Sequence, residues 1–184
     1  MLGAQAAVSL ETARLYAELV DENNQRKKIE KQLRASQTSL ILGEKISNTG
    51  TWHWHVEPDI QYITDEYKRI MGLPADQATT SMAEFQSRVH PDDIHSLREL
   101  IETSVRHGVV MQAEFRIIRD DGECRYIKGI GEPNENWPDV AEYFGTLTDI
   151  TAQRQAEDAV RIAKVELARV ARATTVGQLT SSIA

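Results

Sequence analysis

The chain has 184 residues, of which 28 are acidic and 21 basic, and its formal net charge is −7 with histidines neutral. This acidic balance argues against direct binding to nucleic acid or to an anionic membrane surface. A hydrophobic content of 41% suffices for one compact domain with additional helices. The single cysteine, Cys124, cannot form an internal disulfide, and no long apolar run resembles a membrane span or signal peptide, so we expect a reducing, cytoplasmic location without membrane contact.

Residues 1–41 are predicted to form a helix that takes part in a coiled coil. Apolar side chains recur there at spacings of three and four residues, which is typical of a heptad seam. The seam comprises Val8, Leu15, Leu19, Ile29, Leu33 and Leu40. Polar Glu22 and Arg26 interrupt it, so a single amphipathic helix packed on the next domain is the alternative.

Residues 42–152 are predicted to form the globular domain, because this stretch contains all prolines, tryptophans and histidines of the chain. The runs "GTWHWHV" (50–56) and "IQYIT" (60–64) flank a turn signal and predict a hairpin. Three more strands are expected in "VVMQAEFRIIR", "CRYIKGIGE" and "VAEYFGTLTDI". The pair Asp121-Gly122 between the first two of these is a strong hairpin signal.

Helices are predicted between the first hairpin (residues 50–64) and the three later strands. The segment "DEYKRIMGLP" begins with acidic residues and ends at Gly72 and Pro74, as a short helix would. A longer helix follows Pro91 and ends before Gly108. Its apolar face is predicted to consist of Leu97, Leu100, Ile101 and Val105. The order of elements predicts an α+β domain with a five-stranded antiparallel sheet and helices on one face.

Residues 153–184 are predicted to form a second long helix with its own coiled-coil seam. The seam consists of Ala156, Val160, Ala163, Leu167 and Val170. Its next positions are polar Thr174 and then Gly177, and the apolar stripe resumes in another phase at Val176. We therefore predict a register break at residues 173–175.

Three segments of the central domain resemble signatures of a known family. These are "VHPDD" (89–93), "EFRIIRDDGECRYIKGIG" (114–131) and "GTLTDITAQRQAE" (145–157). In this order and spacing they resemble the PAS domain with its C-terminal PAC motif. The resemblance covers roughly residues 42–156 and implies a PAS fold.

The flanking segments resemble parts of signalling proteins. Residues 5–19 are similar to the last helix of a GAF domain, and residues 171–184 to the stretch before the phosphoacceptor histidine of sensor histidine kinases. The resemblance implies the sensory and dimerisation region of a two-component kinase. Such a parent would be an ATP-dependent homodimer with a kinase core and a response-regulator partner, and this segment would itself hold no catalytic residue. A ligand-free relay module for another output and a haem-binding gas sensor are the alternatives.

Asp149, Ile150 and Thr151 are the candidate residues for signal transmission, because they lie where the last strand meets the final helix. The Thr151 hydroxyl can cap that helix. The resemblance implies that Asp149 pairs with a basic side chain near the sheet and fixes the exit angle of the helix. A simple helix cap is the alternative.

The PAS resemblance leaves the presence of a ligand open, and we predict no cofactor. Covalent flavin chemistry in the light-sensing relatives needs a cysteine on a helix, whereas Cys124 begins a strand. Haem needs an axial histidine facing the pocket. His95 is expected to face water, and His107 to stabilise the end of its helix.

The alternation in "WHWH" places Trp52 and Trp54 on one face of a strand and His53 and His55 on the other. Two histidines on one strand supply at most two metal ligands. No cysteine or second histidine pair lies nearby in the sequence, so no metal site is predicted. The aromatic face is expected to pack into the core or into a dimer surface.

Overall fold

A computed structural model describes the backbone of residues 2–181 and the side chains of residues 14–16 and 18–169. The chain divides into two compact units, Met1–Gly43 and Glu44–Ala184. The helices are α1 (Leu2–Ser47), α2 (Asp65–Met71), α3 (Met82–Ser87), α4 (Ile94–His107) and α5 (Thr151–Ser181). The strands are β1 (Thr49–His55), β2 (Ile60–Ile63), β3 (Thr79–Thr80), β4 (Met111–Ile118), β5 (Cys124–Pro133) and β6 (Glu142–Asp149).

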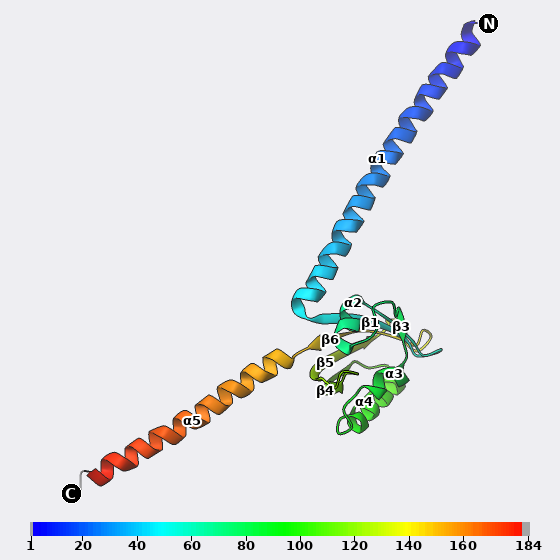
Figure 1. Cartoon of the computed structure of the whole chain (residues 1–184). Coiled ribbons are helices and arrows are strands. Elements are labelled where there is room, and N and C mark those ends of the chain that lie inside the picture. The colour runs from blue at the N-terminus through cyan, green and yellow to red at the C-terminus, as the bar shows by residue number, and fades with distance from the viewer. Residues whose placement is uncertain (1, 182–184) are drawn as a thin grey trace. The chain divides into compact units, whose positions relative to one another are not determined.

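The strands form one antiparallel sheet in the order β3-β2-β1-β6-β5-β4 (Figure 1). The predicted α+β fold is confirmed, but the predicted number of five strands is wrong, because the sheet has six. The additional strand is the edge strand β3, which pairs with β2 through Gln61 and Tyr62. Two residues are too few to produce a recognisable period in the sequence.

Both predicted hairpins are present. In the first, β1 pairs with β2, and Asp59 occupies the left-handed region at φ 62°. The Asp59 side chain accepts hydrogen bonds from Trp54 Nε1 at 2.9 Å and from the Met82 backbone N–H at 3.0 Å, which ties the hairpin to the start of α3. In the second, Gly122 at φ 82° allows the tight turn between β4 and β5.

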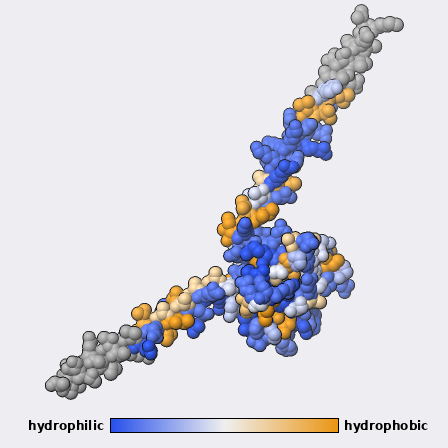
Figure 2. All heavy atoms as spheres, viewed as in Figure 1, coloured by the Kyte–Doolittle hydropathy of each residue, from blue (hydrophilic) through white to orange (hydrophobic). Residues whose placement is uncertain are grey.

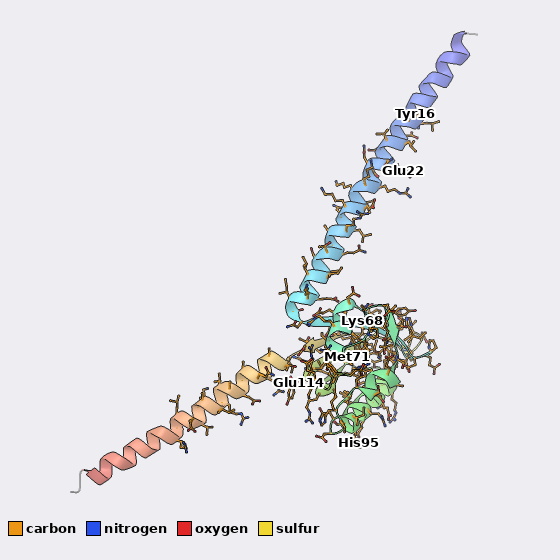
Figure 3. All side chains as sticks on the ribbon, viewed as in Figure 1. Tyr16, Glu22, Lys68, Met71, His95 and Glu114 are labelled. Atoms are coloured by element: carbon orange, nitrogen blue, oxygen red, sulfur yellow. The ribbon has the colours of Figure 1, made fainter. Side chains whose placement is uncertain are left out.

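One face of the sheet packs against α2, α3 and α4 (Figure 1). The predicted inner face of α4 is confirmed, because Leu97 and Ile101 are buried and Leu100 and Val105 pack against the same core. The core is completed by α2, α3 and the strands, through Tyr67, Ile70, Met71, Phe85, Trp54, Phe115, Ile127, Tyr143 and Leu147. Figure 3 labels Met71 within this part of the molecule and His95 on α4. No helix in the described part of the chain is long and apolar enough to cross a bilayer.

Helix α1 spans 46 residues, and its described side chains up to Leu42 are exposed. Its polar surface carries ion pairs one turn apart, such as Arg14–Glu18 and Arg34–Glu30, both at 2.9 Å. Pairs of this kind add only a few tenths of a kcal/mol each. Within the described part of this unit, nothing buries the apolar side chains of α1. A long helix of this kind usually gains most of its stability from packing against a partner.

Candidate functional site

The junction between β6 and α5 is organised by the carboxylate of Asp149. Asp149 Oδ2 accepts a hydrogen bond from Arg125 Nη1 of β5 at 3.0 Å, and each of these two side chains is only 14% exposed. Asp149 Oδ1 accepts a second hydrogen bond, from the backbone N–H of Thr151 at 2.9 Å. One carboxylate thus binds both a neighbouring strand and the first turn of α5. Arg125 is the basic partner that the family resemblance implied.

The Thr151 hydroxyl does not cap α5, contrary to our expectation. It accepts a hydrogen bond from the backbone N–H of Tyr126 in β5 at 3.0 Å. Ile150, which lies between Asp149 and Thr151 in the sequence, is buried. Its backbone N–H donates a hydrogen bond to the Tyr126 carbonyl at 2.9 Å. The chain leaving β6 therefore continues the pairing with β5, and the capping oxygen comes from Asp149 instead.

One further contact fixes the start of α5 on the sheet, and another holds Arg125 in position. Arg154, in the first turn of α5, forms an ion pair with Glu114 of β4, which Figure 3 labels. Arg125 also binds Glu123 at 3.0 Å, and this guanidinium lowers the pKa of the Glu123 carboxyl. The first turn of α5 is thus anchored to both β4 and β5.

The connection from α1 into the sheet reaches the same place. Asn48, at φ 50°, lies between α1 and β1, and its carbonyl accepts a hydrogen bond from the Asp149 backbone N–H at 2.9 Å. The Asn48 side chain accepts another from Arg69 of α2 at 2.9 Å. The hydroxyls of Thr49 and Thr148 lie 3.0 Å apart across the two strands. The entry point of one flanking helix therefore lies beside the exit point of the other.

The cavity between the sheet and the helices is small. It has a volume of about 40 Å³, and its lining includes Tyr67, Phe85, Leu97, Met111 and Leu147. The indole of Trp52 also lines this cavity and lies against Gly131 and Gly145 of the sheet, where an added Cβ would be 2.7 or 2.2 Å from its ring. Pockets that hold small-molecule ligands usually measure about 300–1,000 Å³. The space between the sheet and the helices in this structure is therefore smaller than such pockets.

The residues weighed for cofactor chemistry lie away from this cavity. His95 and His107 are exposed on α4, and Cys124 is exposed at the start of β5. None of these three belongs to the cavity lining. The structure thus brings no axial haem ligand or flavin-reactive thiol to the cavity from these positions.

The opposite face of the sheet holds a cluster that sequence spacing alone did not reveal. His53 and His55 share this face, as predicted, and Glu142 of β6 lies directly opposite His55 in the strand register. His55 Nδ1 lies 2.8 Å and His53 Nε2 3.4 Å from the Glu142 carboxylate. Glu142 thus adds a third candidate ligand from a distant strand, which the search for a nearby cysteine or second histidine pair did not consider.

The predicted coiled-coil residues are exposed wherever their side chains are described. Leu15, Leu19, Ile29, Leu33, Val160 and Leu167 are between 54% and 70% exposed. Figure 2 shows apolar side chains along both flanking helices. The side chain of Val170 and those of the predicted register break at residues 173–175 lie outside the described residues.

Comparison with known proteins agrees with this architecture. A methyl sulfide methyltransferase-associated sensor from Methanosarcina acetivorans is 23% identical over 175 residues, which cover 91% of this chain and 17% of that protein. The chain thus spans about a sixth of this relative. A sensory box histidine kinase/response regulator from Burkholderia thailandensis has a similar structure, with a TM-score of 0.57 and 23% identity over 71% of this chain and 98% of that one.

The N-terminal domain of a diguanylate cyclase from Marinobacter aquaeolei also has this fold, with a TM-score of 0.52 and 19% identity over 58% of this chain and 98% of that one. At these identities the structural likeness shows the fold alone. Residues 60–146 match the family model described as the PAS fold. The six-stranded sheet, the helices on one of its faces and this match identify the globular part of the chain as a PAS domain, a sensory module.

Proposed function

We propose that this chain is the sensory and dimerisation region of a cytoplasmic two-component histidine kinase. In this proposal the PAS domain biases the position of α5, and α5 carries the signal toward a kinase core that acts on a response regulator. The observation that carries the proposal is the hydrogen-bonding of Asp149 to both Arg125 and the Thr151 N–H. A change in the sheet at Arg125 reaches the first turn of α5 through this one carboxylate.

The flanking helices support a homodimer. Apolar residues at heptad spacing are exposed on both α1 and α5, and a second copy of the same helix offers the matching seam. A two-fold axis parallel to the helices would pair each seam with itself. This arrangement would let a small change at the junction alter the packing of both α5 helices together.

The similar proteins support a signalling role but leave the output open. One relative is named as a sensor, and the similar structures come from a histidine kinase/response regulator and a diguanylate cyclase. We favour the kinase because residues 171–184 resemble the stretch that precedes a phosphoacceptor histidine. A relay to another output is the second candidate, supported by the diguanylate cyclase.

The test is the substitution Asp149→Ala in the parent protein, with autophosphorylation and melting temperature measured together. We expect the level of autophosphorylation to change at least severalfold, because α5 loses its link to Arg125, while the core of the PAS domain remains folded. Asp158→Ala is the matched control, since Asp158 is exposed on α5 and its ion pair is with Arg161, one turn away on the same helix.

Unchanged autophosphorylation in a folded Asp149→Ala variant would contradict the role of the junction. A parent protein that lacks autophosphorylation but synthesises a cyclic dinucleotide would replace the kinase with the second candidate.

A further inference from the structure

We propose that His53, His55 and Glu142 form a binding site for a divalent transition-metal ion on the face of the sheet opposite the helices. The ligand atoms of these three residues all lie within 4.8 Å of one another. Among the described residues, this is the one such group of three or more histidine, cysteine or acidic side chains. The inference concerns the PAS domain itself and does not depend on the output of the parent protein.

The strand register brings the three ligands together. His53 and His55 project from the same face of β1, and Glu142 pairs with His55 across the β1–β6 ladder. A tetrahedral ion with bonds of about 2.0–2.2 Å separates its ligand atoms by roughly 3.4 Å. His53 Nε2 and Glu142 Oε2 already lie 3.4 Å apart, and His55 Nδ1 lies 2.8 Å from Oε1. Small side-chain rotations would therefore complete the geometry.

Among the described residues, His53 Nε2 is one of four buried side-chain polar atoms without a hydrogen bond. It is buried and makes no hydrogen bond with the described residues, although the Glu142 carboxylate lies close by. A buried imidazole nitrogen without a partner is unfavourable. A metal ion bound between His53 and Glu142 would provide that partner.

The surroundings hold the ligands in place, as the outer partners of metal ligands do. Asn134 donates a hydrogen bond from Nδ2 to Glu142 Oε2 at 3.0 Å and another from its backbone N–H to the Glu142 carbonyl at 2.8 Å. The Phe144 ring stacks on His53 with centroids 4.1 Å apart. The ring of Tyr62 meets His55 edge-on at 5.6 Å.

Two imidazoles and one carboxylate suit zinc and its neighbours among the first-row metals rather than calcium or magnesium. The side chains of His53 and His55 are 29% and 31% exposed, so water can reach a bound ion. Three protein ligands leave at least one coordination position for water or for a small ligand. The ion would thus lie on the sheet surface and not in the core cavity.

The test uses the whole chain, freed of metal with a chelator and titrated with Zn²⁺. We expect one ion per chain with a dissociation constant in the micromolar range or below, measured by calorimetry and by native mass spectrometry. Glu142→Gln and His53→Gln should each weaken binding at least tenfold. His95→Gln is the matched control, because His95 is exposed on α4, and it should bind as the wild type does.

X-ray absorption on the zinc-loaded wild type provides a second measurement that does not depend on the folding of any variant. We expect scattering from two imidazoles and no sulfur. Absence of stoichiometric binding, a sulfur ligand from Cys124, or equal affinities of wild type and a folded Glu142→Gln variant would overturn the proposal.

Discussion

The PAS domain buries its apolar residues, whereas the flanking helices leave theirs exposed. In the domain, residues from three helices and the sheet share one core, and six apolar side chains, including Tyr67, Ile117 and Tyr143, are less than 2% exposed. In α1 and α5, the leucines and isoleucines of the predicted seams remain exposed. The domain therefore has the contacts needed to fold by itself, whereas the helices need a partner to bury comparable surface. This difference is the one expected if, as proposed, the domain senses and the flanking helices associate with a second copy.

The largest loss of stability is expected when a methyl group is added inside the domain. At Gly50, an added Cβ would lie 2.3 Å from the backbone nitrogen of Tyr67, and backbone atoms cannot move aside as a flexible side chain can. We expect Gly50→Ala to lower the free energy of unfolding of the domain by about 3 kcal/mol or more. Gly43→Ala in α1 has nothing within 4 Å of the new Cβ and should stabilise the helix by about 1 kcal/mol.

Tryptophan fluorescence during urea unfolding reports the effect of Gly50→Ala on the domain without a contribution from α1. The reason is that Trp52, Trp54 and Trp137 all lie in the unit Glu44–Ala184. Circular dichroism at low urea reports the helices as well. Equal urea midpoints for Gly50→Ala and the wild type would show that the close packing of α2 on β1 is wrong.

A smaller loss of stability is expected when the ion pair between the start of α4 and β4 is removed. Asp93 accepts hydrogen bonds from the Arg116 backbone N–H at 2.8 Å and from its guanidinium at 2.7 Å, and this guanidinium lowers the pKa of the carboxyl. A lowered folded pKa stabilises the domain above about pH 4, the unfolded value, and this contribution disappears as the pH falls through the folded pKa. Asp93→Asn should therefore lower the urea midpoint at pH 7 by less than Gly50→Ala does.

At pH 2.5 the difference in urea midpoint between Asp93→Asn and the wild type should be smaller than at pH 7. The matched control is Glu30→Gln on α1, whose exposed pair with Arg34 should leave the midpoint of the domain unchanged at both pH values. A difference for Asp93→Asn that grows as the pH falls would reverse the sign of this linkage and contradict it.

Local signals in the sequence predicted much of the domain. The spacing of Leu97 and Ile101 and the position of Gly108 gave the buried face and the end of α4, and Asp121-Gly122 gave the second hairpin. Helix α3 also has a local signal that we did not use, because Ser81 accepts a hydrogen bond from the Glu84 backbone N–H as a helix cap. The two-residue strand β3 has no comparable signal.

The two sites depend on contacts between residues far apart in the sequence. Glu142 meets His55 only through the register of β6 on β1, and Asn48 reaches Asp149 at the opposite end of the same pair of strands. A partner for Asp149 was expected from the family resemblance, whereas its identity as Arg125 required the pairing of β5 with β6. Sequence spacing reports which face a residue occupies but not which strand lies beside it.

Distances between two copies of the chain test most directly the claim that the flanking helices dimerise in parallel. With Cys124→Ser as background, spin labels at Glu18 and at Lys45, measured in separate samples by pulsed electron resonance, report one position in the N-terminal half of α1 and one near its C-terminal end. Packed helices have axes roughly 10 Å apart, so a parallel dimer should give label separations of roughly 20–30 Å at both positions. A long distance at either position, or a chain that stays monomeric at high micromolar concentration, would contradict the claim.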